Sequence, residues 1–474
     1  MYRLEQASVS VSLPLMKTLL CSLNANRKFG VQGGLFLESK ALTKVQSAGL
    51  IAIVLVAAVG GGTAYMLWIA NQPPTENIRI GVLADLDMPV GKDIYQGALL
   101  AAEQANAEGG ILGRNVTIVA EDDDSITGGD QAVASNALTR LLTVDEADYV
   151  IAGPGAILVQ QDICSEHKKI LFSVWSSNIE HTQRVLDDYD KYKYFFRIWF
   201  PNSTAFNVGH VQGLAALKNL TGFTKIGYLL PDSTVINEYT KPFLESELPK
   251  LGFEIVYRSV YVSATTDFAS YLAAAEASGV EILFIINVQQ SATVVSLIKE
   301  WYDRQAPFVV WGDITAAADL KFWNLTEGKT EYVAIRSSPT VIEYPLTSKT
   351  LVTRKAYLER WGTVPTALGV SAYDVVRFIL PDAVRRAGTT ETEAVIKTLE
   401  TANVETSMAG RFAFTSSHDI MVGEAGVGEL SEQYMLYMIC QWQNGTLVPV
   451  FPNELRIAAG ATYKFPPWQG AWSD

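Results

Sequence analysis

The stretch that most constrains this chain is residues 78–124, where two short apolar segments flank one amphipathic segment. The first, Ile78–Ala84, is rich in β-branched residues and short, which is typical of a buried strand. A helix should follow and end at Gly109 and Gly110, because glycines commonly close helices. Its small apolar residues share one face: Ile94, Ala98, Ala101 and Ala105. Val116–Ala120 then predicts a second strand, so the stretch forms a β-α-β unit, which is typical of a parallel, doubly wound α/β domain.

The same alternation of apolar segments continues along the chain, and 474 residues are too many for one compact core. Further helices are predicted at 127–142, 157–167, 204–220, 237–251, 268–278, 292–304, 351–361, 367–387 and 391–401. Further strands are predicted at 148–152, 170–174, 224–230, 253–259, 281–286, 308–311, 411–414, 433–443 and 446–450. Residues 191–198 lie between two such series, and we expect the chain to cross there into a second region. The pattern therefore predicts two doubly wound α/β lobes joined by several hinge crossings.

Residues 47–70 are uncharged and apolar, and they have about the length of 20 residues that crosses a bilayer. Lys40 and Lys44 precede them, and Glu76 is the first charge that follows. The positive-inside rule then places the N-terminus in the cytoplasm and the rest of the chain outside. A cleaved signal peptide is the alternative, although Trp68 fits poorly at the minus-three position before Ala70. We expect an irregular segment at 1–46, a transmembrane anchor at 47–70 and a linker at 71–77, hence a single-pass cell-membrane protein with an extracytoplasmic body.

Charge and motifs exclude several functions. A net charge of −13 argues against a nucleic acid partner, because its phosphates would be repelled. The four histidines show no metal-binding spacing, and no nucleophile elbow or glycine-rich nucleotide motif occurs, so we expect no enzyme, no cofactor and no metal. The acidic run Glu121–Asp124 could hold calcium, but a strand-end loop followed by a helix cap explains it better. Cys164 and Cys440 are expected to be buried and unpaired.

Four stretches together resemble one known family: Ile78–Asp85, Gly97–Ser125, Tyr149–Pro154 and Lys169–Asn178. Through them the chain from residue 78 to 450 is similar to the extracytoplasmic solute-binding proteins of ABC importers. The resemblance is to the branched-chain amino-acid-binding (leucine/isoleucine/valine) type, with the periplasmic-binding-protein type I fold. It implies two lobes joined by three crossings that close on a small ligand. It also implies a membrane permease and cytoplasmic ATPases as partners. We assign residues 78–198 and 336–408 to lobe 1, 199–335 and 409–450 to lobe 2, and 451–474 to a C-terminal tail.

The candidate ligand site follows from the loops at the carboxyl ends of the predicted strands, which face the crevice in open α/β sheets. The resemblance implies that the turn after residue 174 gives a hydroxyl and backbone groups to the ligand, and that an acid at position 313 pairs with its ammonium. The backbone after Gly153 could meet a carboxylate, since helix N-termini attract anions. An ordinary serine-rich helix cap and a solvated loop aspartate are the alternatives. The expected ligand-binding residues are Gly155, Ala156, Trp175, Ser176, Ser177, Thr234, Gln289 and Asp313.

Some of these loops depart from the family pattern, so leucine-like specificity does not follow. The loop after Gly153 is short and lacks a Ser/Thr pair, while Thr234 and Gln289 stand where aromatic residues are frequent in the family. The expected function is capture of a small amino-acid-like ligand between the lobes and its delivery to an ABC permease. Two alternatives stay open: a ligand-sensing receptor ectodomain, and a binding protein for amides, urea-like or other small polar solutes.

Overall fold

The computed structural model describes residues 76–469 except 126–129, 154, 156, 200, 235, 263–264, 288–291 and 424–428. Residues 75–474 form one compact unit, and all that follows concerns this unit. The expected membrane anchor at 47–70 lies outside the described residues. No helix of the described part is both long and apolar enough to cross a bilayer.

The first lobe is built on a five-stranded parallel sheet in the order β2-β1-β3-β4-β5. Its strands are β1 (Ile78–Ala84), β2 (Val116–Asp122), β3 (Tyr149–Ala152), β4 (Ile170–Ser173) and β5 (Phe195–Arg197). Its helices are α3 (Pro89–Ala107), α4 (Gln131–Thr143), α5 (Ile157–Glu166), α6 (Glu180–Asp187) and α7 (Tyr189–Tyr192). The strand β1 is buried at six of its seven positions, as a central parallel strand covered on both faces should be.

The second lobe repeats this order and adds two antiparallel strands. Its seven-stranded sheet runs β12-β11-β10-β9-β8-β6-β7, and β7-β6-β8-β9-β10 is parallel throughout. The strands are β6 (Lys225–Pro231), β7 (Glu254–Tyr261), β8 (Ile282–Asn287), β9 (Val309–Ile314), β10 (Ala334–Arg336), β11 (Ile439–Gln443) and β12 (Thr446–Phe451). The helical segments are α8 (Ser203–Thr221), η1 (Ile236–Thr240), α9 (Lys241–Lys250), α10 (Ala269–Ala277), α11 (Ala292–Asp303), η2 (Thr315–Ala318) and α12 (Phe322–Leu325).

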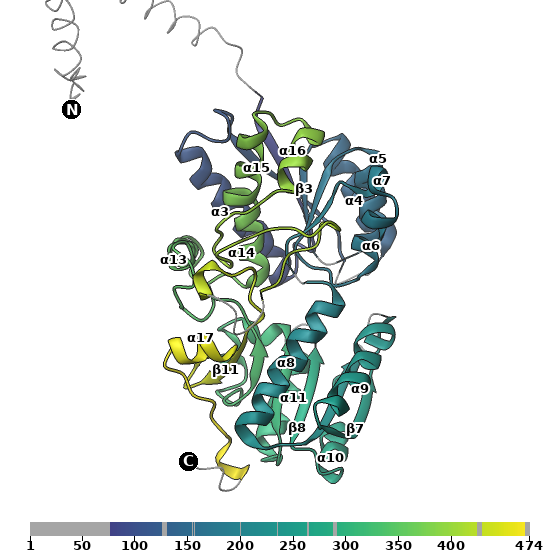
Figure 1. Ribbon diagram of the computed structural model, residues 1–474, viewed down its shortest axis with the longest axis vertical. Coiled ribbons are helices and arrows are strands. Elements are labelled where there is room, and N and C mark those ends of the chain that lie inside the picture. The colour runs from purple at the N-terminus through teal and green to yellow at the C-terminus, as the bar shows by residue number, and fades with distance from the viewer. Residues whose placement is uncertain are drawn as a thin grey trace, which may run out of the picture. The chain divides into compact units, whose positions relative to one another are not determined.

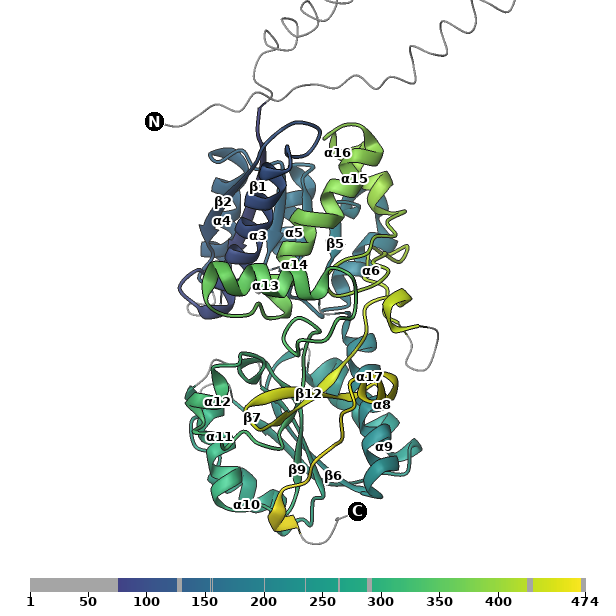
Figure 2. The same ribbon diagram turned by 90° about the vertical axis from the view of Figure 1, so that its left-hand side faces the viewer.

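After β10 the chain returns to the first lobe and then crosses again. Figures 1 and 2 show the green helices α14 to α16 beside the strands of the first lobe, although they follow the second lobe in sequence. These late segments are α13 (Thr350–Trp361), α14 (Ala367–Asp374), η3 (Val375–Ile379), α15 (Leu380–Ala387), α16 (Thr392–Leu399) and η4 (Leu430–Glu432). Crossings therefore follow β5, β10 and residue 420, and the predicted α/β class with two parallel-stranded sheets is confirmed.

A buried carboxylate joins the returning helix α14 to the first lobe. Gly97 of α3 and Gly369 of α14 let the two helices touch, since a Cβ on Gly97 would lie 2.0 Å from the Gly369 carbonyl oxygen. Asp93 accepts hydrogen bonds from the backbone nitrogens of Thr366 (3.1 Å) and Gly369 (2.9 Å), and from the Tyr357 hydroxyl (2.6 Å). It thus satisfies amides at the N-terminus of α14 that would otherwise be unpaired. The start of α14 is thereby held next to the start of α3.

Three expectations about the connections need correction. Residues 191–198 do not simply cross to the second lobe, because Phe195–Arg197 pairs with β4 as the edge strand β5. Residues 411–414 form only isolated bridges, at Phe412 and Phe414, and Phe414 packs on Phe196 of β5, whereas residues from 409 onward were assigned to lobe 2. The strand predicted at 433–443 is confined to β11. Residues 412–420 are held at the sheet edge by aromatic packing, by a hydrogen bond from the Arg197 nitrogen to the His418 carbonyl at 3.0 Å, and by the ion pair of Arg197 with Asp419.

The C-terminal segment belongs to the second lobe as far as the structure describes it. The helix α17 (Asn453–Ala458) follows β12, and η5 (Pro467–Gln469) lies near α11. The Trp468 indole nitrogen donates to the Ala306 carbonyl at 3.0 Å and its ring meets the Trp301 ring edge-on. Cys164 and Cys440 are free and buried, each in a different core cluster.

Candidate functional site

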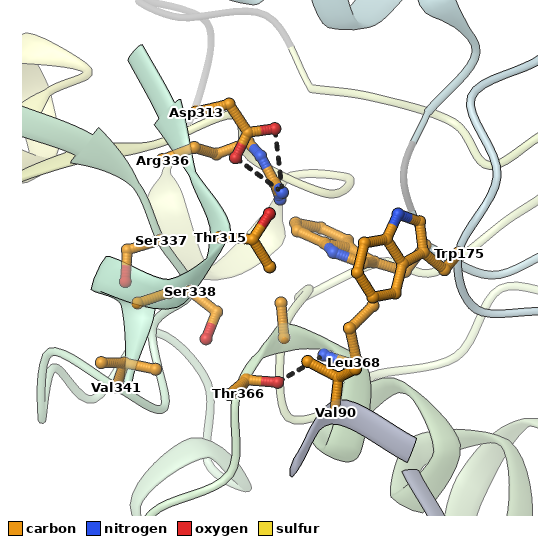
Figure 3. A pocket seen from close by; sticks show the side chains of 13 residues that line it. Val90, Trp175, Asp313, Thr315, Arg336, Ser337, Ser338, Val341, Thr366 and Leu368 are labelled. Atoms are coloured by element: carbon orange, nitrogen blue, oxygen red, sulfur yellow. Dashed lines mark hydrogen bonds and ion pairs between the residues drawn. The ribbon is translucent and has the colours of Figure 1, made fainter. Parts of the chain in front are cut away.

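A pocket between the two lobes lies at the carboxyl ends of corresponding strands in the two sheets. The first lobe contributes residues after β4 and β5 and from the starts of α3 and α14. The second lobe contributes residues at and after the ends of β9 and β10. Its empty volume is about 460 Å³ when space open to solvent is counted, and the space that the centre of a water molecule can reach is about 30 Å³. Its described lining, drawn in Figure 3, is Val90, Trp175, Trp199, Asp313, Thr315, Ala318, Arg336, Ser337, Ser338, Val341, Thr366, Ala367 and Leu368.

A buried ion pair forms the polar wall of this pocket. Asp313 lies in β9 and Arg336 ends the neighbouring strand β10, so parallel pairing brings the two side chains together across 23 residues of sequence. The Arg336 Nη2 lies 3.3 Å and 3.4 Å from the two carboxylate oxygens of Asp313. The two residues are only 9% and 2% exposed. The pairing compensates both charges, which would otherwise be costly to bury.

Two tryptophans form much of the remaining wall. Trp175 follows β4 and is partly exposed, and Figure 3 shows its indole across the pocket from Arg336. Trp199 lies in the crossing after β5, is 3% exposed, and its ring centre lies 5.3 Å from the Arg336 guanidinium carbon. That distance permits a cation–π contact, which orients the guanidinium. The Trp199 backbone nitrogen contacts the carbonyl of Ser173 at the end of β4, so the fold fixes this side chain.

The apolar floor comes from two helix starts of the first lobe. Val90 belongs to the first turn of α3, and Leu368 to the first turn of α14. Asp93 joins these two turns, and burial raises its pKa to about 6. A second, wider hollow adjoins the pocket, because Val90, Thr315 and Thr366 line both. The site is thus the inner part of a groove between the lobes.

The groups packed behind the ion pair carry no further charge at neutral pH. His210 is buried, and its burial together with the charge of Arg336 holds its pKa well below the usual range. Burial likewise raises the pKa of Tyr437 well above its usual value. Both side chains are therefore neutral, and the electrostatic field at this wall comes mainly from Arg336 and Asp313.

The structure brings together two of the eight expected ligand-binding residues. Trp175 and Asp313 line the same pocket, whereas its described lining does not include Gly155, Ser176, Ser177 or Thr234. Ala156 and Gln289 lie outside the described residues.

The other expected residues have local structural partners or face solvent. The hydroxyl of Ser176 lies 2.8 Å from His181 Nε2, and the carbonyl of Ser177 accepts from the Ser203 nitrogen at 2.7 Å. Gly155 and Thr234 are exposed. The serine-rich helix cap is not seen either, because α6 has Ile179 at its N-cap without a side-chain cap; Asn178 of the same turn accepts from the Glu180 nitrogen at 2.9 Å.

Asp313, which the resemblance pairs with a ligand ammonium, already has an ion-pair partner in the protein, Arg336. Sequence reasoning missed Arg336 and Trp199. The sequence did contain a signal for Arg336, because it directly follows the apolar residues 333–335 and precedes two serines. A residue at the crevice end of a buried strand is expected in such a position. Nothing in the sequence distinguished Trp199 from a core tryptophan.

Comparison with known proteins supports one family. A family model described as periplasmic binding protein matches residues 77–433. No curated protein matches the chain. Among solved structures, a branched-chain amino acid ABC transporter protein from Silicibacter pomeroyi is 18% identical with a TM-score of 0.68, over 83% of this chain and all of that one.

Two further similar structures contain a ligand. A solute-binding protein of an ABC transporter from R. palustris, in complex with benzoate, is 14% identical with a TM-score of 0.62, over 79% of this chain and 95% of that one. A branched-chain amino acid transporter substrate-binding protein from Streptococcus pneumoniae, in complex with isoleucine, is 18% identical with a TM-score of 0.62, over 78% and 97%. At these identities the likeness shows the fold, and the family follows from the model match, which spans most of the chain. The resemblance drawn from the sequence is thus confirmed: the chain belongs to the periplasmic binding protein family.

Proposed function

We propose that this protein captures a small organic solute between its two lobes and delivers it to an ABC permease driven by cytoplasmic ATPases. The observation that carries the proposal is the pocket, which both lobes line at the carboxyl ends of corresponding strands. A ligand there touches both lobes at once and favours their closure, because it binds the closed arrangement better than the open one. A permease could distinguish closed from open lobes and so receive only loaded protein.

The three crossings support hinge closure. They begin after β5, β10 and residue 420, at strand or segment ends, where a few residues can absorb a change of backbone angles. The pocket lies close to these crossings, since Trp199 belongs to the first and Ser337 to the second. A small rotation at the hinge would therefore close the groove over the bound solute.

We infer that the solute carries a carboxylate. The ligands named for the two complexed neighbours, isoleucine and benzoate, share that group. In this chain the cation that lines the pocket is Arg336, whose planar guanidinium matches a carboxylate. An amino acid, as the sequence suggested, and a simple organic acid both belong to this class.

We also propose that residues 47–70 anchor the protein in the cell membrane with the body outside. The support is the uncharged apolar composition of that segment and the basic residues before it. Mass spectrometry of the protein purified from its native membrane would find an intact N-terminal peptide. A mature N-terminus near Asn71 would show cleavage instead.

The solute-binding function is tested by a thermal-shift screen of the full-length protein against amino acids, organic acids, amides and sugars. A true ligand at 100 times its Kd should stabilise the fold by about 2.7 kcal/mol. Small-angle scattering with that ligand should show a smaller radius of gyration. If no solute of any class shifts the melting temperature, or a confirmed ligand leaves the scattering unchanged, the proposal fails.

A further inference from the structure

The polar wall of the pocket disfavours an ammonium group on the ligand. Asp313 is the one acidic side chain in the described lining, and its charge is already matched by Arg336. An α-ammonium group placed there would have to compete with a guanidinium for this carboxylate. Burying an ammonium without a partner is strongly unfavourable. The wall is therefore poorly suited to the ammonium half of an amino acid.

The same wall offers donors to an anion. The indole Nε1–H of Trp199 is buried, and no acceptor among the described residues lies within hydrogen-bond distance of it. An indole nitrogen can only donate. The hydroxyl of Thr315 likewise has no hydrogen-bond partner in the described part of the chain, and Figure 3 shows Thr315 beside the Arg336 guanidinium. A buried donor without an acceptor is destabilising, so a ligand that supplies acceptor oxygens here is favoured.

The rest of the described lining includes aromatic and aliphatic surface. Trp175 and Trp199 contribute two indole rings, and Val90, Val341 and Leu368 contribute aliphatic surface. Trp175 is partly exposed although it lies in the groove, so a ligand ring that covers it would remove apolar surface from water. Aromatic rings gain more than aliphatic ones from such contacts, because of their edge-on and offset-stacked geometries.

We propose that the solute is an aromatic carboxylate without an amino group, held by its carboxylate at Arg336, Trp199 Nε1 and Thr315, and by its ring at Trp175. This inference rests on the proposed solute-binding function and specifies its ligand. The ion pair with Asp313 positions the guanidinium, and the ligand carboxylate shares it. The bound state then contains two carboxylates and one guanidinium, and the two neutral donors form hydrogen bonds with the ligand carboxylate.

Calorimetry of the full-length protein with four probes tests the inference: benzoate, benzamide, cyclohexanecarboxylate and L-phenylalanine. Benzoate should bind. Benzamide has the same shape without the charge and should bind at least about 30-fold more weakly, the loss expected for a buried charged hydrogen bond. Cyclohexanecarboxylate should bind a few-fold more weakly, which measures the aromatic contribution. L-Phenylalanine should bind at least about 10-fold more weakly because of its ammonium.

Two substitutions test whether Arg336 and Trp199 bind the ligand carboxylate. Arg336→Gln should weaken benzoate binding at least about 30-fold. Trp199→Phe keeps a ring and removes only the indole N–H, so it should weaken benzoate about 5- to 10-fold and leave benzamide less affected. The matched control is Arg258→Gln, on β7 and half exposed, which should leave all affinities unchanged. If Arg336→Gln fails to fold, Trp199→Phe and the four wild-type probes still decide the question.

The outcomes distinguish this inference from the proposed solute-binding function on which it rests. No binding of benzoate, tighter binding of L-phenylalanine, or equal binding of benzamide would overturn the aromatic-carboxylate inference. If the solute screen then finds a sugar or an amide that shifts the melting temperature and compacts the protein, solute binding stands without this ligand class. If nothing binds at all, both fail together.

Discussion

Two arginines occupy equivalent places in the two lobes and have different surroundings. Arg197 ends β5 and Arg336 ends β10, each the fifth strand of a parallel order 2-1-3-4-5. Arg197 is fully buried (0% exposed), its Nε lies 2.8 Å from Asp419, and its Nη2 donates to the carbonyl of Asn178. Arg336 pairs with Asp313 at the longer distance of 3.3 Å and lines the pocket.

The difference teaches that the same strand position can serve folding in one lobe and line a pocket in the other, where we propose that it binds the solute. In the first lobe the partner aspartate comes from the late segment 412–420, so the ion pair fixes that segment on the sheet edge. In the second lobe the partner comes from the adjacent strand, and Arg336 belongs to the pocket lining. Each ion pair compensates the cost of burying its arginine, but of the two arginines only Arg336 belongs to the described pocket lining.

The largest effect on stability is expected at the fully buried ion pair of Arg197 and Asp419. Asp419→Asn leaves the Arg197 guanidinium buried without a counter-charge, so the free energy of unfolding should fall by about 3–5 kcal/mol. Chemical denaturation at pH 7 measures it. The control Asp190→Asn removes an almost fully exposed carboxylate and should change stability by less than about 0.5 kcal/mol. A loss below about 1 kcal/mol for Asp419→Asn would mean that water reaches Arg197.

A buried aspartate without an arginine provides the next comparison. Asp374 accepts from the Ser407 backbone nitrogen at 3.1 Å, and burial raises its pKa to about 7. The folded protein then binds the proton more tightly than the unfolded chain, whose aspartates titrate near 4. Stability from this group is therefore full below about pH 4, falls as the pH rises to about 7, and is constant above that.

The asparagine variant isolates this pH dependence. The shift of Asp374 corresponds to a decline of up to about 4 kcal/mol between pH 4 and pH 8. Asp374→Asn cannot titrate, so the difference in unfolding free energy between pH 5 and pH 8 should shrink by about 2–3 kcal/mol. In this variant Asp93, whose pKa is raised to about 6, should still cause a smaller decrease of the unfolding free energy as the pH rises. An unchanged difference in the variant would exclude Asp374 as its source.

Removing the aspartate of the Arg336–Asp313 pair should lower stability less than removing the aspartate of the Arg197–Asp419 pair. Asp313→Asn leaves Arg336 facing the pocket, where water can solvate it, so stability should fall by only about 1–2 kcal/mol. Benzoate affinity should stay within about 10-fold of wild type, because Asp313 orients the guanidinium without touching the solute. A stability loss as large as that of Asp419→Asn would remove the distinction between the two pairs.

The smallest effect is expected at the turn favoured by the family resemblance. Ser177→Ala should change the binding free energy of benzoate by less than about 0.5 kcal/mol, because the described pocket lining does not include Ser177. A direct hydrogen bond to the ligand would cost about 1–3 kcal/mol instead. Calorimetry distinguishes the two values, and the larger one would restore the serine-rich turn as the ligand site.

Most of the fold could be predicted from the sequence because its strands are long apolar runs. Ile78–Ala84 is predicted to the residue, since both faces of a central parallel strand are apolar and charged residues follow it. The edge strand β5 was missed, because Phe195–Arg197 is too short to show a periodicity and follows a charged, tyrosine-rich helix. Edge strands and late crossings depend on tertiary contacts that a local pattern does not contain.

The site was less predictable, for a physical reason. The carboxyl-end rule indicated the loop after β4, because it depends only on where strands end, and the family resemblance indicated Trp175 and Asp313, which both line the pocket. Whether Asp313 is a free charge depends on Arg336, and that pairing is set by the order of β9 and β10 in the sheet. Charge at a site is thus a property of the assembled sheet and cannot be assigned to a single loop.

A crystal structure of the protein grown with benzoate tests the central claim most directly. The account predicts a ligand between the lobes, with its carboxylate oxygens within hydrogen-bond distance of Arg336 and Trp199 Nε1 and its ring against Trp175. A ligand bound at Ser176 and Ser177, with Arg336 contacting only Asp313, would contradict it.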